Sequence, residues 1–233
     1  MEITIAYLFP DLLNLYGDKG NIIALRKRLK DRGIEPIVKH YSVDDAIDFN
    51  GTDILYIGGG SERSEEIALK RLMELKEDIK AYAENGGVIL GVCSGYEMLG
   101  NYIKTGKTKK DALGILDIHT DYGKKRMIGD VILESGDFGS IAGFENRYGE
   151  VSANGLTPLG KVQHAKSGRS NTEGVIHKNI VATHLHGPIL PKNPRLADFL
   201  IKKALENKYG KAEIKDLDDS MEIKANEYIK TLF

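Results

Sequence analysis

A single cysteine, no tryptophan and no long apolar segment set the first limits on this sequence. One cysteine excludes a disulfide within the chain and is typical of a reducing compartment, so we expect a cytoplasmic protein. No apolar run approaches the ~18 residues that a membrane-spanning helix needs, which predicts no direct membrane insertion. The opening residues MEITIAYLFPDLL also lack the basic segment and the small-residue cleavage site of a signal peptide.

An excess of charge of one sign is missing as well, because 33 Lys and Arg residues face 34 Asp and Glu residues. A formal net charge of -1 gives no electrostatic footprint for nucleic acid. The 233 residues, 41% of them hydrophobic, are enough for a large buried core. We interpret residues 1–209 as one α/β domain and residues 210–233 as a charged extension that contains a packed helix, Met221–Ile229.

The first half of the chain alternates between apolar strands and amphipathic helices. Short apolar runs predict strands over Ile3–Phe9, Ile37–Tyr41, Asp53–Ile57 and Val88–Val92. Apolar residues at helical spacing predict helices over Asn21–Arg32, Glu62–Asn85 and Ser94–Tyr102. This order predicts an α/β fold, in which helices flank a mostly parallel sheet and the crossovers are right-handed.

The second half is less regular, and we expect it to add short strands to the sheet. Apolar runs between glycine-rich turns predict these strands over Met127–Leu133, Val162–Ala165, Gly174–Ile176 and Ile180–Leu185. A helix is expected over Pro194–Lys208. The lysine-rich segment Lys104–Lys110 lacks large apolar residues and is expected to be an exposed loop.

The segment Gly91-Val92-Cys93-Ser94-Gly95 lies where a buried strand is expected to give way to a helix. This is the glycine-flanked pattern of a nucleophile elbow, with cysteine in place of serine. The positive end of the following helix lowers the pKa of such a thiol, so we expect a thiolate nucleophile. The amide of Ser94 and the loop Gly58–Gly60 are the natural donors for an oxyanion hole. A buried structural cysteine is the alternative interpretation.

Six histidines are candidates for the base that such a nucleophile needs. His184 and His186 follow a predicted strand, and their spacing puts both side chains on one face of it. Gly187-Pro188 ends the strand, so His186 is expected at the carboxyl edge of the sheet beside Cys93, with His184 one layer deeper. The pair is also compatible with zinc, but two ligands do not make a site, and we expect no metal.

Four further motifs accompany the elbow and the histidine segment in a fixed order. They are Leu15-Tyr16-Gly17-Asp18-Lys19-Gly20-Asn21, Gly58-Gly59-Gly60, Arg126-Met127-Ile128-Gly129-Asp130 and Gly143-Phe144-Glu145-Asn146. With GVCSGYEMLG and THLHGPILPKNP, they resemble the GatD-like class I glutamine amidotransferases of the cobyric-acid-synthase type, from about residue 5 to residue 195. The resemblance implies a flavodoxin-like α/β fold with a mostly parallel sheet.

The resemblance also implies a role for each matching residue. Cys93 is then the nucleophile, His186 the general base, and Gly59 and Ser94 the oxyanion donors. Arg126 binds the α-carboxylate of glutamine, a task that suits a guanidinium group. Without the resemblance, its place in the run Lys124-Lys125-Arg126 favours a solvated surface charge.

Three departures from the family pattern concern the site. Many members carry Glu two residues after the histidine, where this chain has Pro188. The third catalytic group is then Asp18, which is expected at the same sheet edge, or a carboxylate of the partner subunit; a turn-forming role is the alternative for Asp18. The glycine loop continues as Ser61-Glu62-Arg63-Ser64, and Asn146 is followed by Arg147-Tyr148-Gly149-Glu150, both unlike the family.

The function that the resemblance implies is that of the glutaminase subunit of lipid II isoglutaminyl synthase. Such a subunit hydrolyses L-glutamine and passes ammonia to a Mur-ligase-like synthetase in a heterodimer. No cofactor is expected in this chain, which has no G-x-x-x-x-G-K-[ST] phosphate loop, so ATP and Mg²⁺ are expected on the partner. The alternatives are another ammonia acceptor such as a corrinoid acid, a cysteine hydrolase or peptidase on the same fold, and an inactive regulatory module.

Overall fold

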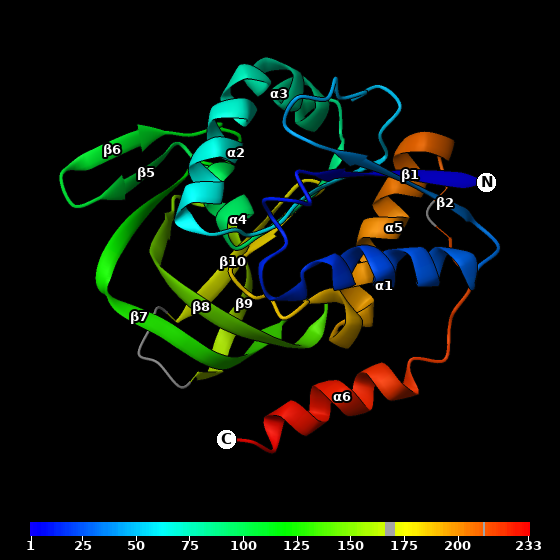
Figure 1. Ribbon diagram of the computed structural model, residues 1–233. Coiled ribbons are helices and arrows are strands. Elements are labelled where there is room, and N and C mark those ends of the chain that lie inside the picture. Colours follow the sequence, from blue (N-terminus) through cyan, green and yellow to red (C-terminus); the bar gives the residue numbers. More distant parts are fainter. Residues whose placement is uncertain (166–170, 212) are drawn as a thin grey trace.

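The computed structural model describes residues 1–165, 171–211 and 213–233 (Figure 1). Within them, one 11-stranded sheet has the order β2-β1-β3-β4-β11-β10-β9-β7-β5-β6, and β8 pairs with β7. The strands are β1 (Glu2–Leu8), β2 (Glu35–Tyr41), β3 (Ile54–Ile57), β4 (Val88–Val92), β5 (Tyr102–Thr105), β6 (Thr108–Asp111), β7 (Ile118–Ser135), β8 (Gly139–Ala153), β9 (Thr157–Ala165), β10 (Thr172–His177) and β11 (Ile180–Thr183). The helices are α1 (Lys19–Lys30), α2 (Glu62–Glu74), α3 (Lys76–Glu84), α4 (Ser94–Met98), α5 (Pro194–Tyr209) and α6 (Ser220–Lys230), with short 3-10 helices η1 (Leu15–Gly17) and η2 (Leu190–Lys192).

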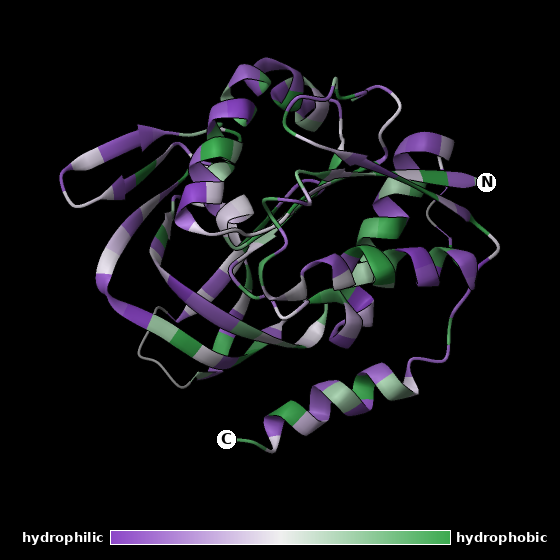
Figure 2. Cartoon of the chain, viewed as in Figure 1, coloured by the Kyte–Doolittle hydropathy of each residue, from purple (hydrophilic) through white to green (hydrophobic). Residues whose placement is uncertain are grey.

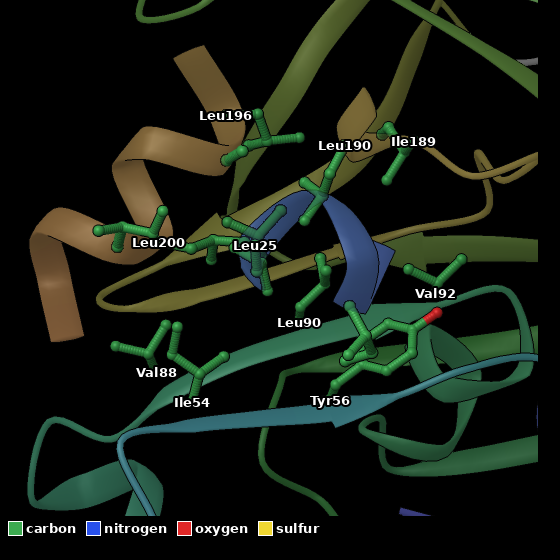
Figure 3. Close-up of a cluster of buried hydrophobic side chains, with 14 of the residues drawn as sticks. Leu25, Ile54, Tyr56, Val88, Leu90, Val92, Ile189, Leu190, Leu196 and Leu200 are labelled. Carbon is green, nitrogen blue, oxygen red and sulfur yellow. The ribbon is translucent and has the colours of Figure 1, made fainter. Parts of the chain in front are cut away.

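The first part of the sheet, β2-β1-β3-β4-β11, is parallel throughout. Every residue of β3 and β4 is buried, as expected for strands covered on both faces. Successive residues point to opposite faces, so Tyr56 lies in the same buried cluster as Leu25 of α1 and Leu200 of α5 (Figure 3). Leu55 packs with Leu72 of α2 on the other face. This layering confirms the predicted parallel sheet between helices.

The second part of the sheet is antiparallel, and its strands are longer than the sequence indicated. β7 has 18 residues and β8 has 15, and they pair along most of their length (Figure 1). The expectation of short strands is wrong here because one face of each strand is largely solvated. Polar residues such as those between Tyr122 and Met127, where the pairing register shifts, interrupt the apolar runs that mark a buried strand.

Three local boundaries also differ from the prediction. The helix expected over Glu62–Asn85 is divided at Leu75, whose φ of -99° and ψ of 8° end α2 before α3 begins. The helix expected over Ser94–Tyr102 ends at Met98. The segment expected to be a loop, Lys104–Lys110, forms most of the β5–β6 hairpin, an exposed and mainly hydrophilic arm (Figure 2). Cross-strand backbone hydrogen bonds supply the order that the polar sequence did not suggest.

The C-terminal helix α6 lies against β8 and η2. The side-chain amide of Asn226 donates to the backbone oxygens of Ser140 and Lys192, each at 3.1 Å. The guanidinium of Arg28 in α1 binds Asp219, just before α6, at 2.6 Å. Among the residues described, no helix is long and apolar enough to cross a membrane.

Candidate active site

Cys93 occupies a strained turn between β4 and α4, with φ of 56° and ψ of -117°. Positive φ is rare for a residue with a side chain and is tolerated where the surrounding packing enforces it. The flanking glycines allow that packing, since a Cβ on Gly95 would lie 2.2 Å from the backbone oxygen of Ile57. The geometry is that of the predicted nucleophile elbow, and the thiol is half-buried rather than enclosed.

The two expected oxyanion donors lie against the thiol. A Cβ on Gly59 would be 2.7 Å from the Cβ and 3.2 Å from the Sγ of Cys93, so only glycine fits there. A hydrogen bond from the backbone amide of Ser94 to the sulfur lowers the pKa of Cys93. The amide of Gly60 donates to the hydroxyl of Ser94 at 3.1 Å, which ties the glycine loop to the elbow. The structure therefore brings Gly59 and Ser94 together beside the sulfur.

The expectation of a low thiol pKa is wrong for this chain. Burial raises the pKa of Cys93 well above its ordinary value, and the nearby carboxyls of Glu97, Glu65 and Asp18 raise it further. α4 has only five residues, so its positive end contributes little against these effects. The thiol is therefore protonated at rest, and a base must remove its proton during attack.

His186 lies at the same sheet edge as Cys93. β11 and β4 are parallel neighbours with Thr183 opposite Val92, and the amide of Cys93 donates to the oxygen of Thr183 at 2.8 Å. The His186 side chain is fully buried, yet neither ring nitrogen has a hydrogen-bond partner among residues 1–165, 171–211 and 213–233. Burial lowers the pKa of His186 to about 4, so its imidazole is neutral and can accept a proton.

Two aromatic side chains hold the His186 ring in place. Tyr16 stacks on it, with ring centroids 4.7 Å apart, and Phe144 meets it edge-on at 5.8 Å. The backbones of His186 and Phe144 also exchange hydrogen bonds of 2.9 and 3.1 Å. Sequence reasoning gave no role to Tyr16 or Phe144, although both lie in the motifs that it singled out.

Asp18 is a buried carboxyl at this edge. Its side chain is 1% exposed, and neither carboxyl oxygen reaches a hydrogen-bond partner in the described part of the chain. Burial raises the pKa of Asp18 to about 7, while the nearby amides of Gly59 and Gly187 act in the opposite direction. Because Gly187 follows His186, the carboxyl lies beside both the oxyanion loop and the histidine segment. Pro188 packs against Gly20, where an added Cβ would lie 2.3 Å from Pro188 Cγ.

Arg126 is exposed and reaches the edge of the site through two side chains. Its Nε donates to Asn146 Oδ1 at 2.6 Å, and the Asn146 amide donates to the Tyr16 hydroxyl at 2.6 Å. Tyr16 is the residue that stacks on His186. These contacts join β7, β8 and η1 beside His186. The two terminal nitrogens of the Arg126 guanidinium stay at the surface.

His184 belongs to a buried polar network that the sequence did not reveal. Its Nε2 lies 3.1 Å from a carboxylate oxygen of Glu97, and its Nδ1 lies 3.7 Å from Glu173. The Tyr122 hydroxyl donates to the other oxygen of Glu97 at 2.9 Å. Carboxylates therefore lie near both ring nitrogens of His184. The described residues contain no group of three or more side chains suited to a metal ion.

A family model for the CobB/CobQ-like glutamine amidotransferase domain matches residues 4–194. The chain is 41% identical over 234 residues to a protein of Staphylococcus aureus (strain N315), a match that spans 98% of this chain and 95% of that one. That protein is named lipid II isoglutaminyl synthase (glutamine-hydrolyzing) subunit GatD. A protein of the same name from Streptococcus pneumoniae (strain ATCC BAA-255 / R6) is 35% identical, with 90% of this chain and 83% of that one covered. The cobyric acid synthase of Rhodococcus jostii (strain RHA1) is 31% identical over 66% of this chain but only 30% of its own length.

Two solved structures support the fold. A glutamine amidotransferase superposes with a TM-score of 0.59 at 20% identity, covering 85% of this chain and 98% of that chain. The glutaminase domain of Trypanosoma brucei CTPS, solved with acivicin, superposes with a TM-score of 0.58 at 12% identity over 92% and 98% of the two chains. The predicted resemblance and fold class are therefore confirmed. The chain belongs to the CobB/CobQ-like glutamine amidotransferase family.

Proposed function

We propose that this chain is the glutamine-hydrolysing subunit of a lipid II isoglutaminyl synthase, and that Cys93 and His186 carry the reaction. The observation that carries the proposal is a strained, half-buried thiol after β4 and a buried histidine after the neighbouring strand β11, and neither ring nitrogen of that histidine has a hydrogen-bond partner among the described residues. A buried polar group without a partner costs about 1–3 kcal/mol, so the fold retains it where a reaction uses it.

The reaction is acyl transfer through a thioester. As the sulfur of Cys93 attacks Cδ of glutamine, its proton passes to His186, and the amides of Gly59 and Ser94 stabilise the oxyanion. The imidazolium then protonates the departing nitrogen, the C–N bond breaks, and ammonia leaves. His186 next removes a proton from water, which attacks the thioester and yields glutamate and the free thiol. The neutral imidazole and the protonated thiol of the resting site are the starting states that this sequence needs.

Asp18 is the third group in this proposal. Its carboxyl lies beside Gly187, is sheltered from water, and has a pKa of about 7. Ionised Asp18 stabilises the imidazolium that forms during attack, as the carboxylate of a serine-protease triad does. A carboxylate of the partner subunit is the rival, and the Asp18→Asn variant in the assembled complex distinguishes the two.

Arg126 binds the α-carboxylate of glutamine in this proposal. Its Nε is occupied by Asn146, which fixes the plane of the guanidinium and leaves other N–H groups for a carboxylate. Replacing Arg126 by Lys keeps the charge but loses this fork. We expect a rise in KM for glutamine with little change in kcat.

The partner in this proposal is a Mur-ligase-like synthetase that supplies ATP and Mg²⁺ and amidates a lipid-linked cell-wall precursor in the cytoplasm. Its support is the nearly full-length match to the two GatD proteins, each named as a synthase subunit. The cobyric acid synthase of Rhodococcus jostii matches 66% of this chain at 31% identity, against 98% at 41% for the Staphylococcus aureus protein, so a corrinoid acceptor is the weaker alternative.

The test is ammonia release from L-glutamine by the wild-type chain and by Cys93→Ala, each alone and with the Mur-ligase-like partner. Labelling by 6-diazo-5-oxo-norleucine, located by mass spectrometry, reports on the nucleophile separately from turnover. We expect labelling at Cys93 and turnover that rises when the partner is added, with both lost in Cys93→Ala. No labelling and no ammonia, with the partner present, would sink the proposal.

A further inference from the structure

Tyr16 lies between the histidine of the candidate site and solvent. Its ring stacks on the imidazole of His186, with ring centroids 4.7 Å apart and ring planes 26° apart. Tyr16 is 43% exposed, whereas His186 is fully buried. The exposed ring of Tyr16 therefore separates one face of the buried imidazole from water, and removing the ring opens that face.

The backbone at Tyr16 has a conformation that a residue with a side chain rarely adopts. Tyr16 has a φ of 59° and Gly17 a φ of 77°, so two consecutive residues lie in the left-handed region. A Cβ on Gly17 would meet no atom within 4 Å, so this glycine is needed for its backbone angles and not for packing. Strain of this kind persists where surrounding contacts enforce it, and it is concentrated at functional sites.

Hydrogen bonds hold this strained turn from two sides. The amide of Leu15 donates to the backbone oxygen of Gly59 at 2.9 Å, which joins the turn to the oxyanion loop. The side-chain amide of Asn146 in β8 donates to the Tyr16 hydroxyl at 2.6 Å. The Tyr16 ring is therefore fixed at its backbone and at its hydroxyl, and the imidazole of His186 packs against a ring that is itself held in place.

The neutral state of His186 depends on its burial. Burial is the largest cause of its low pKa of about 4, and the nearby His184 and Lys192 act in the same direction. The Asp18 carboxyl and the Cys93 thiol are the other titratable groups at this edge of the sheet. All four neighbours stay in place when the stacked ring is removed, so burial of the imidazole is the contribution that changes.

We propose that Tyr16 is the positioning residue of the general base, and that its ring fixes the plane of the His186 imidazole and excludes water from one face of it. The inference rests on the proposed function for the reaction that His186 carries out. Water admitted to the imidazole competes for its ring nitrogens and stabilises the imidazolium before substrate binds. A base that Tyr16 keeps dry and oriented is instead ready to take the proton of the Cys93 thiol.

The experiment compares Tyr16→Ala, which removes the ring, with Tyr16→Phe, which keeps the ring and loses the hydrogen bond from Asn146. Tyr148→Ala is the matched control, because Tyr148 is 40% exposed and its ring centroid lies 5.7 Å from the Arg126 guanidinium at the edge of the site. NMR of 15N-labelled histidine side chains follows the titration, and the signal lost in His186→Gln identifies His186. Tyr16→Ala is expected to raise the pKa of His186 from about 4 to between about 5.5 and 6.5, whereas Tyr16→Phe and Tyr148→Ala keep it low.

Hydrolysis of L-glutamine in the presence of the Mur-ligase-like partner gives the second readout. At about pH 7, kcat of Tyr16→Ala is expected to fall about 10- to 100-fold with little change in KM, because the imidazole loses its orientation while the groups that bind glutamine remain. The acid limb of the kcat/KM profile moves to higher pH with the pKa of His186. Tyr16→Phe is expected to recover most of the rate.

The titration of His186 needs no turnover, so it separates this inference from the proposed function. A wild type that hydrolyses no glutamine, together with a raised His186 pKa in Tyr16→Ala, contradicts the proposed function and leaves the role of Tyr16 over the imidazole standing. The same His186 pKa in the wild type and in Tyr16→Ala overturns the inference. In an active wild type, an unchanged kcat in Tyr16→Ala, or equal losses in Tyr16→Ala and Tyr16→Phe, overturns it as well.

Discussion

Cys93 is surrounded by acidic side chains, and this sets its reactivity in the isolated chain. Its pKa is raised by burial and by Glu97, Glu65 and Asp18, so the thiolate is scarce at neutral pH. A thiol reacts with alkylating agents through its thiolate, so its alkylation rate follows its ionisation. The Cys93 thiol is therefore weakly reactive in the isolated chain. A positively charged group of a substrate or partner beside the thiol is expected to lower its pKa and increase its reactivity.

Alkylation of Cys93 is expected to be slow near pH 7 and to rise about tenfold per pH unit, without a plateau, to about pH 9. Intact-mass measurement of iodoacetamide labelling gives a clean rate, because the chain has no other cysteine. Glu97→Gln removes one of the acidic neighbours and is expected to speed labelling at fixed pH. A plateau between about pH 6 and pH 7 would show a stabilised thiolate and contradict this account.

Asp18 is expected to reduce stability at neutral pH. Its pKa rises from 3.8 in a model peptide to about 7 in the fold, so the folded state binds the proton more tightly than the unfolded state. The stability contributed by the protonated carboxyl is complete below about pH 4 and is lost as pH rises through about 7. At about 1.4 kcal/mol per pKa unit, the loss at pH 8 is on the order of 4 kcal/mol.

Asp18→Asn removes this titration, so its melting temperature relative to the wild type is expected to increase between about pH 5 and pH 8. Thermal unfolding followed by circular dichroism at both pH values measures the difference. The same variant is expected to lose activity, because its amide cannot stabilise an imidazolium. A melting difference that is independent of pH would mean that Asp18 titrates normally in the fold.

Gly59 is constrained by the thiol rather than by its own backbone angles. A Cβ there would approach the Cβ of Cys93 to 2.7 Å, so Gly59→Ala must displace either the loop or the nucleophile. A displacement of about 1 Å at a reacting centre costs on the order of 100-fold in rate, and that loss of kcat/KM is expected. Gly136→Ala is the control, since a Cβ at Gly136 meets no atom within 4 Å. Full activity in Gly59→Ala would rule out a rigid oxyanion loop.

At the scale of elements, buried segments were predictable and exposed segments were not. The bounds of β4 were predicted to the residue, because a strand buried on both faces needs an unbroken apolar run. β7 and β8 were underestimated because one solvated face admits polar residues that hide the alternation. No glycine or proline stands at Leu75, where α2 ends and α3 begins, so the sequence carried no local signal for this break.

The parts of the site that lie in a sequence motif at the end of one strand could be predicted. The parts formed by side chains from several helices and strands could not. The elbow and the histidine at the end of β11 follow from strand order alone. The network of Glu65, Glu97, Tyr122 and His184 joins α2, α4, β7 and the end of β11, and no sequence spacing encodes that convergence. Tyr16 and Asn146 had a weaker signal, since both lie in segments that resemble the family.

Asn226 is the one buried residue of α6, and its side-chain amide ties the helix to the body. Asn226 donates to two backbone oxygens and lies 2.9 Å from Asn193. Asn226→Ala leaves these partners unsatisfied and is expected to cost about 1–3 kcal/mol. Denaturant unfolding measures the loss, and limited proteolysis is expected to release α6 first. Glu227→Ala, at the exposed neighbouring position, is the control and is expected to behave as the wild type.

At the scale of the whole molecule, the site joins the parallel and antiparallel parts of one sheet. Cys93 and His186 follow parallel strands, whereas Phe144 and Asn146 belong to β8 in the antiparallel part. The backbone pairing of Phe144 with His186 closes the two parts over the site, and the sheet between them is continuous through β11, β10 and β9. Loss of either part therefore removes groups from the same catalytic edge.

This continuity predicts that residues 1–209 unfold as one cooperative unit. Because both parts share strands and buried clusters, neither retains a complete core alone, and the transition is expected to be two-state. Urea unfolding followed by far-UV circular dichroism and by the reaction of Cys93 with a fast thiol reagent is expected to give the same midpoint. Free cysteine in the same urea series corrects for the reagent. If Cys93 reacts at a lower urea concentration than the loss of ellipticity, the elbow opens before the sheet unfolds, and the catalytic edge is a separate, less stable unit.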